Sequence, residues 1–413
     1  MKLLIIGFVW PEPNSSAAGS RMVQLIGAFR SEDYQITFAS AAAKSEHAVN
    51  LDALGVSCEK IKLNHSSFNL FIDELQPDVV LFDRFMTEEQ YGWRVSEQCP
   101  NAFRILDTED LHSLRKSRQE CSNNGEEFTI GKWLQADITK REIASIYRCD
   151  LSLIISNYEV HLLHDILKIE KSLLHYLPFM LDEVTMEHTK KIPSFDDRKH
   201  FITIGNFRHE PNYDSIVYLK EIIWPMIRKE LPESEMHIYG SYPMAKVTQL
   251  NSKKEGFLIK GWADNVDEIM RSARVCLAPL RFGAGIKGKF IDAMKNGTPS
   301  VTTSIGAEGI DDDFGGIIED RLQEIVNKAV QLYTNETLWN EKQEAGYRLL
   351  KQFDKTKLQK GFLVKLKAAR KQILHSRLNN FIGAMLQHQS MQGSKYMSKW
   401  IEEKNDNVQS SGH

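Results

Sequence analysis

Residues 274–309 constrain the fold more than any other part of the chain. An apolar run at 275–278 predicts a buried strand, and a loop interrupted by three glycines follows it. Apolar residues then recur at helical spacing as far as the turn Asn296-Gly297, and a second short apolar run ends the unit. This order of strand, loop, helix and strand predicts two parallel strands joined by a helix.

The loop of this unit carries basic side chains as well as glycines. Lys287 and Lys289 flank Gly288, and the helix is expected to begin at about Lys289. The N–H groups of such a loop and the N-terminus of the helix face the carboxyl end of the sheet, where an anion can bind. The alternative is an ordinary crossover whose two lysines are solvated. We favour a phosphate site, because small residues, basic residues and the turn GAEG occur together.

Apolar strands alternate with helical patterns over most of the 413 residues. This alternation is typical of α/β proteins with parallel sheets, and the length suits two domains of ordinary size. The boundaries that we predict are a first domain at 1–180, a polar linker at 181–200, a second domain at 201–350 and a helical tail at 351–413.

Polar residues follow two predicted strands of the first half. Asp83 and Arg84 come after one strand, and the stretch DTEDLH at 107–112 comes after another. Ligands bind at this edge of open α/β sheets. The acids could also hold a metal ion, although no second acidic cluster accompanies them. Asp107 or Asp110 could instead cap the helix that follows.

Three further segments could line a ligand site. The loop at 10–19 ends in Ala18 and Gly19 before a helix expected near residue 20, and it contains no GxGxxG motif. The loop GNFRHEPN in the second half supplies Gly205, Asn206 and Arg208. Trp262 could stack on a flat ligand or cover the sheet edge. A plain strand-to-helix turn and an exposed surface arginine are the alternatives for the first two segments.

The segment FGAGIKGKFIDAMKNGTPSVTTSIGAEG resembles the donor-binding segment of GT-B glycosyltransferases, in the group that uses nucleotide-diphosphate sugars and retains the anomeric configuration. That family has two glutamates eight positions apart in this segment. The second falls on Asp292, whose carboxylate could accept hydrogen bonds from ribose hydroxyls. The first falls on Ala284, which cannot make the sugar contact of a glutamate.

The resemblance implies an α/β protein with the GT-B fold, in which two Rossmann-like domains face a cleft and a helical tail follows. It implies that His112 contacts the sugar, with Asp110 as a base or as a group that orients His112. Arg208 and Lys287 would stabilise the leaving diphosphate. The remaining predicted donor residues are Gly205, Asn206, Trp262, Gly283, Gly285, Ile286, Lys289 and Asp292, and the predicted acceptor-loop residues are Ala18 and Gly19.

The activity implied is transfer of a sugar from a nucleotide-diphosphate sugar to a glycan, a lipid-linked acceptor or a small molecule, in polysaccharide or cell-envelope glycan biosynthesis. We expect retention, no metal and no cofactor. No side chain replaces the nucleophile position at Ala284, which favours a same-face reaction assisted by the departing phosphate. The two alternatives are a nucleotide-sugar 2-epimerase and a partner subunit without activity.

Composition limits the partners and the compartment. A net charge of −3 argues against binding nucleic acid. Five scattered cysteines without a CxxC pair suit a reducing cytoplasm. No apolar stretch approaches the roughly 20 residues of a membrane span, and the first apolar run reads as a strand. We expect a cytoplasmic protein, whose basic tail packs on the first domain or contacts the inner face of an anionic membrane.

Overall fold

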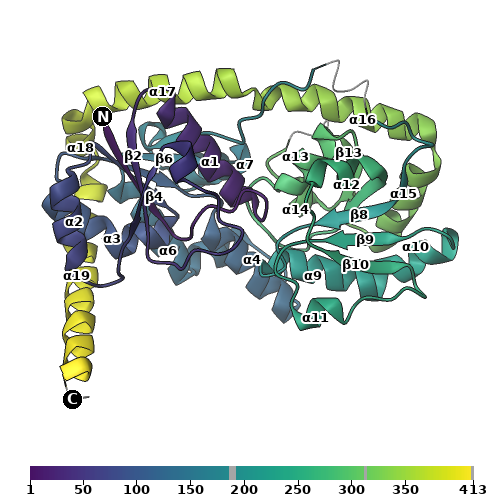
Figure 1. Ribbon diagram of the computed structural model, residues 1–413, viewed down its shortest axis with the longest axis horizontal. Coiled ribbons are helices and arrows are strands. Elements are labelled where there is room, and N and C mark those ends of the chain that lie inside the picture. Colours follow the sequence, from purple (N-terminus) through teal and green to yellow (C-terminus); the bar gives the residue numbers. More distant parts are fainter. Residues whose placement is uncertain (186–191, 311–313, 411–413) are drawn as a thin grey trace.

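The computed structural model describes residues 1–185, 192–310 and 314–410, and it contains two parallel β-sheets with flanking helices (Figure 1). This architecture is the predicted pair of Rossmann-like domains with a helical tail. Residues 186–191 of the predicted linker lie outside the described residues.

The first sheet has seven parallel strands in the order β3-β2-β1-β4-β5-β6-β7. Successive residues of its central strands point to opposite faces. Leu4 and Ile6 therefore enter one apolar core, while Leu3 and Ile5 enter the other. The strands are β1 Lys2–Gly7, β2 Gln35–Ser40, β3 Ser57–Lys60, β4 Val79–Asp83, β5 Phe103–Asp107, β6 Leu151–Ile154 and β7 Leu174–Tyr176.

The second sheet has six parallel strands in the order β10-β9-β8-β11-β12-β13. Val275 and Leu277 of β11 face one core, and Cys276 and Ala278 face the other. Both faces are thus covered, as the continuous apolar runs predict. The strands are β8 Lys199–Ile204, β9 Met236–Tyr239, β10 Phe257–Gly261, β11 Ala273–Ala278, β12 Ser300–Thr302 and β13 Gly316–Ile318.

Helices connect the strands. In the first domain they are α1 Ala17–Arg30, α2 Ser67–Leu75, α3 Phe85–Gln98, α4 His112–Asn124, α5 Ile130–Gln135, α6 Asp137–Arg148 and α7 Asn157–His161. In the second they are α9 Glu210–Tyr218, α10 Trp224–Glu230, α11 Ala245–Thr248, α12 Val266–Ser272, α13 Gly288–Lys295, α14 Ser304–Ala307, α15 Leu322–Thr334 and α16 Glu336–Leu350.

The strand, glycine loop, helix and strand of residues 274–309 fold as predicted. β11, the glycine loop, α13 and β12 follow one another, and β11 pairs in parallel with β12. The first helix, in contrast, begins earlier than the predicted residue 20. It begins at Ala17, because the Ser16 side chain accepts a hydrogen bond from the Gly19 N–H at 3.0 Å and caps the helix there.

The tail returns to the first domain through α17 Lys355–Lys371, α18 Ile373–Asn379 and α19 Phe381–Ser410 (Figure 1). Phe362 and Leu366 of α17 enter a core of the first domain. The Arg377 guanidinium binds both carboxylate oxygens of Asp150, at 2.7 and 2.8 Å. The tail therefore packs on the first domain, which is one of the two outcomes that the sequence left open. No helix among the described residues combines the length and apolarity that crossing a membrane requires.

Candidate functional site

A cavity of about 830 Å³ lies between the two domains. Its walls come from segments that follow β1, β4 and β5 in the first sheet and β8, β9, β10 and β11 in the second. Every predicted site residue lines this cavity, namely Ala18, Gly19, Asp110, His112, Gly205, Asn206, Arg208, Trp262, Gly283, Gly285, Ile286, Lys287, Lys289 and Asp292. The structure thus brings together residues from both halves of the chain.

Hydrogen bonds between the domains close one side of the cavity. The Ser15 hydroxyl donates to the Ser241 hydroxyl at 2.8 Å, and the Asn206 amide donates to Ser15 Oγ at 3.3 Å. The Tyr242 hydroxyl donates to the Glu12 carboxylate at 2.7 Å. The predicted acceptor loop therefore lies directly against the predicted donor loop.

The glycine loop brings its backbone close to the first domain. Gly285 has φ +65°, and a Cβ there would come within 2.9 Å of Asp110 Cβ. A Cβ on Gly288 would come within 2.8 Å of Ala17 Cβ. Both positions thus require glycine. The contact also means that α1 and α13 begin next to each other, so two helix N-termini meet at the cavity and favour an anion there.

The two lysines of the loop are half-buried, and the Lys287 Nζ atom lies out of contact with solvent. Lys287 Nζ has no hydrogen-bond partner among the described residues. Burial lowers the pKa of Lys287 to about 8, against the opposing effect of Glu308. Lys289 Nζ donates to Asn212 Oδ1 at 2.8 Å, and burial lowers the pKa of Lys289 to about 8 as well. The Lys287 ammonium is therefore a hydrogen-bond donor without an acceptor at the start of α13.

Asp292 lies one turn further along α13, in its second turn. Its carboxylate is half-buried at the cavity, and burial raises the pKa of Asp292 to about 6 although Lys295 opposes this. In the second turn the Asp292 carboxylate gains little from the helix dipole, since that effect is confined to the first turn.

Ala284 is buried against a core of the first domain. The neighbouring Gly285 N–H donates to Glu159 Oε1 of α7 at 2.8 Å, and the same oxygen accepts from the Leu111 N–H at 3.0 Å. A carboxylate from the first domain thus contacts this loop. Burial, and then Asp110, raise the pKa of Glu159 to about 8.

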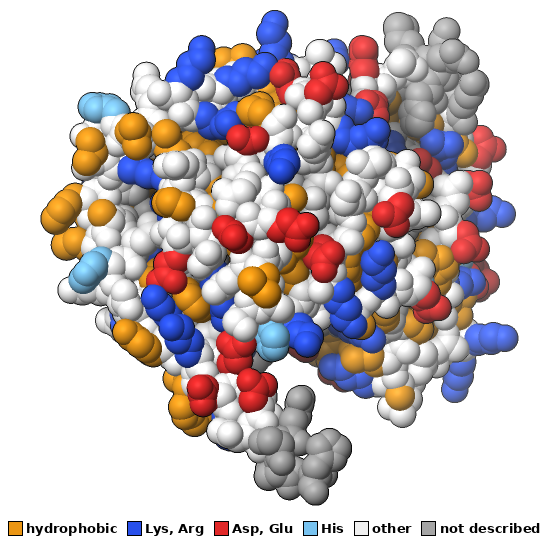
Figure 2. All heavy atoms as spheres, turned by 60° about the vertical axis from the view of Figure 1, so that its left-hand side comes forward, with side chains coloured by type: hydrophobic (Ala, Val, Ile, Leu, Met, Phe, Trp, Pro, Cys, Tyr) orange, Lys and Arg blue, Asp and Glu red, His pale blue; other side chains and the backbone are white. Residues whose placement is uncertain are grey.

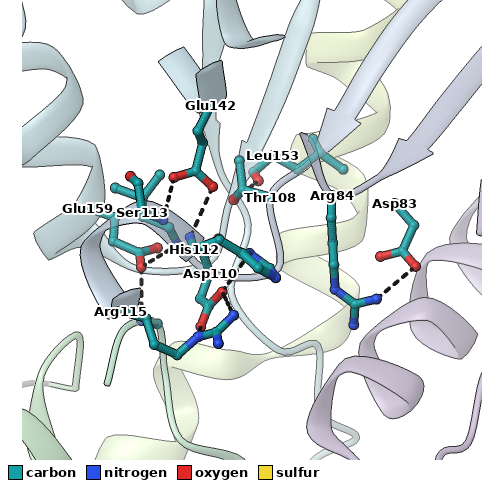
Figure 3. Close-up of polar contacts among 12 residues, drawn as sticks. Asp83, Arg84, Thr108, Asp110, His112, Ser113, Arg115, Glu142, Leu153 and Glu159 are labelled. Carbon is teal, nitrogen blue, oxygen red and sulfur yellow. Dashed lines mark hydrogen bonds and ion pairs between the residues drawn. The ribbon is translucent and has the colours of Figure 1, made fainter. Parts of the chain in front are cut away.

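Asp110 holds both His112 and Arg115 (Figure 3). Its Oδ1 lies 2.9 Å from His112 Nδ1, and its Oδ2 accepts from Arg115 Nε at 2.7 Å. Burial alone would raise the pKa of Asp110, but Arg115 and His112 lower it well below its usual value. Such a weakly basic carboxylate suits a group that orients His112 better than a general base.

The start of α4 differs from the predicted cap. Neither Asp107 nor Asp110 caps this helix. Glu142 of α6 accepts from the N–H groups of His112 and Ser113, at 2.9 Å each (Figure 3). Asp107 instead binds the Arg21 guanidinium at 2.8 Å with both side chains buried. Among the described residues no group of three or more His, Cys, Asp or Glu side chains is arranged to hold a metal ion.

Arg208 and Trp262 have aromatic partners. The Arg208 guanidinium lies 3.8 Å from the ring centroid of Tyr242. Trp262 stacks on His47 of the first domain, with centroids 4.2 Å apart and an angle of 6° between the rings. One face of Trp262 is therefore covered by the first domain, which neither predicted role included.

Two residues in the first-domain wall have unusual backbone conformations. Arg84 has φ 74° and ψ 156°, a region that is almost restricted to glycine. Glu109 has φ 63°. Each such conformation costs on the order of 1–3 kcal/mol and persists only where the surrounding structure imposes it, often at ligand sites.

Comparison with known proteins shows which family the second domain resembles. Residues 198–335 match the family model of the glycosyl transferases group 1. An uncharacterized 44.6 kDa protein from the cps region of Klebsiella pneumoniae is 28% identical over 142 residues, which are 32% of this chain and 36% of that protein. The chain therefore matches only about a third of the length of this relative.

Solved glycosyltransferase structures share the fold along nearly the whole chain. WaaG, a glycosyltransferase involved in lipopolysaccharide biosynthesis, superposes with a TM-score of 0.62 at 11% identity, over 89% of this chain and 98% of that chain. Anabaena HepE in complex with UDP and glucose has a TM-score of 0.63 at 10% identity, over 89% and 99%. Sucrose-phosphate synthase from Thermosynechococcus elongatus has a TM-score of 0.63 at 13% identity, over 91% and 100%. The chain thus has the GT-B fold, and its residues 198–335 match the model of the glycosyl transferases group 1.

Proposed function

We propose that this protein is a glycosyltransferase that transfers a sugar from a nucleotide-diphosphate sugar to a hydroxyl group of an acceptor. The donor binds the second domain, and the acceptor binds the first. The reaction retains the anomeric configuration and needs neither a metal ion nor a cofactor. UDP or GDP is the nucleotide of the donor.

The single observation that carries this proposal is the buried, unpartnered Lys287 ammonium at the N-terminus of α13. A cation without a partner is costly in a buried position unless a ligand supplies the counter-charge. A diphosphate placed there would meet Lys287, the glycine-loop N–H groups and two helix N-termini. Asp292, a turn away, would accept hydrogen bonds from ribose hydroxyls.

The relatives support the donor chemistry. Crystals of HepE hold UDP and glucose, and a TarM structure from S. aureus holds UDP with α-GlcNAc-glycerol. In this chain, charge that develops on the leaving diphosphate would be stabilised by Lys287 and by Arg208, which both belong to the second domain. His112, held by Asp110, would donate a hydrogen bond to the sugar. The match to a cps-region protein and the likeness to WaaG suggest cell-envelope glycan synthesis.

A subunit that binds the nucleotide sugar without transferring it is the second candidate. Ala284 favours it, because this buried methyl group replaces a glutamate of the family. The Glu159 carboxyl group of the first domain accepts a hydrogen bond from the N–H of Gly285, the next residue of the loop, but Glu159 is not among the residues that line the cavity.

We also propose a peripheral contact with the inner face of an anionic membrane, through the turn between α18 and α19. Residues 355–400 contain ten Lys and Arg residues and no Asp or Glu. Leu374, Leu378 and Phe381 are exposed on this basic tail. Figure 2 turns this end of the molecule forward and shows hydrophobic side chains beside Lys and Arg side chains on the surface.

A two-stage screen tests the enzymatic proposal. Thermal-shift measurements with UDP, GDP and their sugar conjugates identify the donor, because a bound ligand raises the melting temperature. The donor is then incubated with oligosaccharide, glycolipid and simple alcohol acceptors, and the product is analysed for its anomeric configuration. Binding followed by transfer with retention is expected. Binding without transfer to any acceptor would favour the inactive subunit, and absence of nucleotide binding would contradict both.

A further inference from the structure

The first-domain wall of the cavity contains residues to which the donor chemistry gives no role. Phe8 follows β1, Asp83 and Arg84 stand at the end of β4, and Glu109 follows β5. All of them line the cavity on its first-domain side, opposite the domain that carries the glycine loop. Because the three strands are neighbours in the sheet, these side chains gather at one edge.

Phe8 offers an apolar surface to a ligand. It is 43% exposed although it lines the cavity, and its neighbour Val9 is 44% exposed. The ring is nevertheless held in place. The Phe8 N–H donates to Asp83 Oδ2 at 2.9 Å, and the Arg84 guanidinium lies 5.3 Å from the ring centroid. A fixed, exposed aromatic ring in a cavity wall suits stacking against the C–H face of a pyranose.

A carboxyl oxygen of Asp83, beside this ring, lacks a hydrogen-bond donor, and a second carboxyl group, on Glu109, lines the same wall. Glu109 is 8% exposed. Asp83 is buried, with Oδ2 bound to Arg84 at 3.3 Å (Figure 3) and with Oδ1 lacking a partner among the described residues. Buried carboxyl oxygens are normally satisfied, so unfilled ones at a cavity indicate a ligand that donates hydrogen bonds.

The backbone at this wall supports the same conclusion. Arg84 and Glu109 both have positive φ, and the Arg84 N–H donates to the Asp107 carbonyl at 2.8 Å, which fixes the two loops together. Glycine would avoid the strain at both positions. The surrounding structure therefore imposes strain at both positions, as often happens at ligand sites.

The charge of this wall decides the class of ligand. Its lining includes four carboxyl groups, on Glu12, Asp83, Glu109 and Asp110, and two guanidinium groups, on Arg84 and Arg115. Arg84 is paired with Asp83, and Arg115 is paired with Asp110. No positive charge remains for a phosphate or a carboxylate. Hydroxyl groups, in contrast, can donate to Glu109 and Asp83 and accept from Arg84.

We propose that Phe8, Asp83, Arg84 and Glu109 form the acceptor subsite and that they bind an uncharged sugar unit. This inference rests on the proposed glycosyl transfer, because it identifies the acceptor of that reaction. The sugar stacks on Phe8, and its hydroxyl groups bind Glu109 and Arg84. One hydroxyl oxygen bonds to the anomeric carbon of the donor as the bond from that carbon to the diphosphate breaks. The hydroxyl proton passes to the released diphosphate.

Saturation-transfer NMR on the full chain tests this subsite without requiring turnover. The probes are methyl glucoside, methyl galactoside and methyl mannoside, together with methyl glucuronide, which differs from methyl glucoside only in its carboxylate. At least one neutral probe should bind, and methyl glucuronide should bind at least tenfold more weakly than methyl glucoside. Phe8→Ala and Glu109→Gln should each weaken binding of the neutral probe by tenfold or more.

Two variants outside the cavity serve as controls. Leu70→Ala removes an exposed apolar side chain from α2, and Glu59→Gln removes an exposed carboxylate from β3. Both should bind the probe like the wild type. The subsite is refuted if no neutral probe binds, if methyl glucuronide binds as well as methyl glucoside, or if Phe8→Ala and Glu109→Gln retain wild-type affinity. A parallel titration with UDP and GDP separates this failure from failure of the donor site.

Discussion

Arg118 of the first domain and Glu308 of the second form a bidentate ion pair. Arg118 Nη1 lies 2.8 Å from Glu308 Oε1, and Nη2 lies 2.7 Å from Oε2. Arg118 Nη1 also donates to the Gly283 carbonyl at 2.8 Å, and both side chains are buried. This pair therefore joins the two domains directly beside the glycine loop and fixes its position.

The first prediction concerns this pair. Arg118→Met and Glu308→Gln should each lower the free energy of unfolding, because each leaves a buried charge without its partner, at a cost of up to about 3–5 kcal/mol. The double variant should lose less than the sum of the two single losses. Chemical denaturation and donor titration of the four proteins measure this coupling. Strictly additive effects would mean that the pair contributes nothing to either property.

The second prediction concerns the pH dependence of donor binding. Burial raises the pKa of Asp292 to about 6, so this carboxyl group gains a proton as the pH falls through 6. Ribose hydroxyls donate to the ionised form, and donor affinity should therefore drop between pH 7 and pH 5. Asp292→Asn should lower affinity at pH 7 by about 10- to 150-fold, the equivalent of one charge-assisted hydrogen bond of 1.5–3 kcal/mol, and should flatten the profile.

The variant Asp292→Asn should also change the stability of the protein, and in the opposite direction to donor affinity. A carboxyl group whose pKa is raised on folding destabilises the protein above that pKa, so Asp292→Asn should unfold at a higher temperature than the wild type at pH 7. Asp292→Glu restores the side chain that the family has and should retain binding. Wild-type donor affinity in Asp292→Asn would show that no ribose contact exists.

The third prediction concerns metal ions. Two of the three carboxylates of the acidic stretch are bound to cations of the protein, since Asp107 binds Arg21 and Asp110 binds Arg115. Glycosyl transfer should therefore survive EDTA when product nucleotide is removed during the assay. A complete loss of activity that Mg²⁺ or Mn²⁺ restores would contradict a metal-independent mechanism.

The fourth prediction concerns the tail. The triple variant Leu374→Ser, Leu378→Ser and Phe381→Ser should sediment less with phosphatidylglycerol vesicles than the wild type, because it loses apolar surface beside basic residues. Leu70→Ser, which removes a comparably exposed leucine from α2, should sediment normally. Equal binding of the wild type to phosphatidylcholine and phosphatidylglycerol vesicles would count against an anionic surface.

Local pattern was sufficient to predict much of this molecule. The run of apolar residues in β11, the glycine loop and the helical spacing of α13 are properties of neighbouring residues, and that unit folds as predicted. The residues predicted to form one site line one cavity because parallel strands direct their following loops to the same edge.

The groups that fix the site depend on contacts between distant residues and left no local signal. Glu159 binds the N–H of Gly285, 126 residues away, and Glu142 replaces the predicted side-chain cap of α4. Both looked like ordinary helix residues. The sequence around Arg84 and Glu109 does not indicate a positive φ, because neither residue is a glycine and no glycine adjoins them. The surroundings of Lys287, which the alternative of solvated lysines did not include, also come from distant residues, namely Asp110, Arg118 and Glu159 of the first domain.

The most direct test of the account is a calorimetric titration of UDP and GDP into the wild type, Lys287→Met and Lys253→Met. Lys253 is exposed in the same domain and serves as the control. At least one nucleotide should bind the wild type, with affinity falling above pH 8 as Lys287 loses its proton. Lys287→Met should bind that nucleotide about 10- to 150-fold more weakly, yet melt at a higher temperature, because it no longer buries an unpaired ammonium. Wild-type affinity in Lys287→Met, or a wild type that binds neither nucleotide, would contradict the proposed donor site.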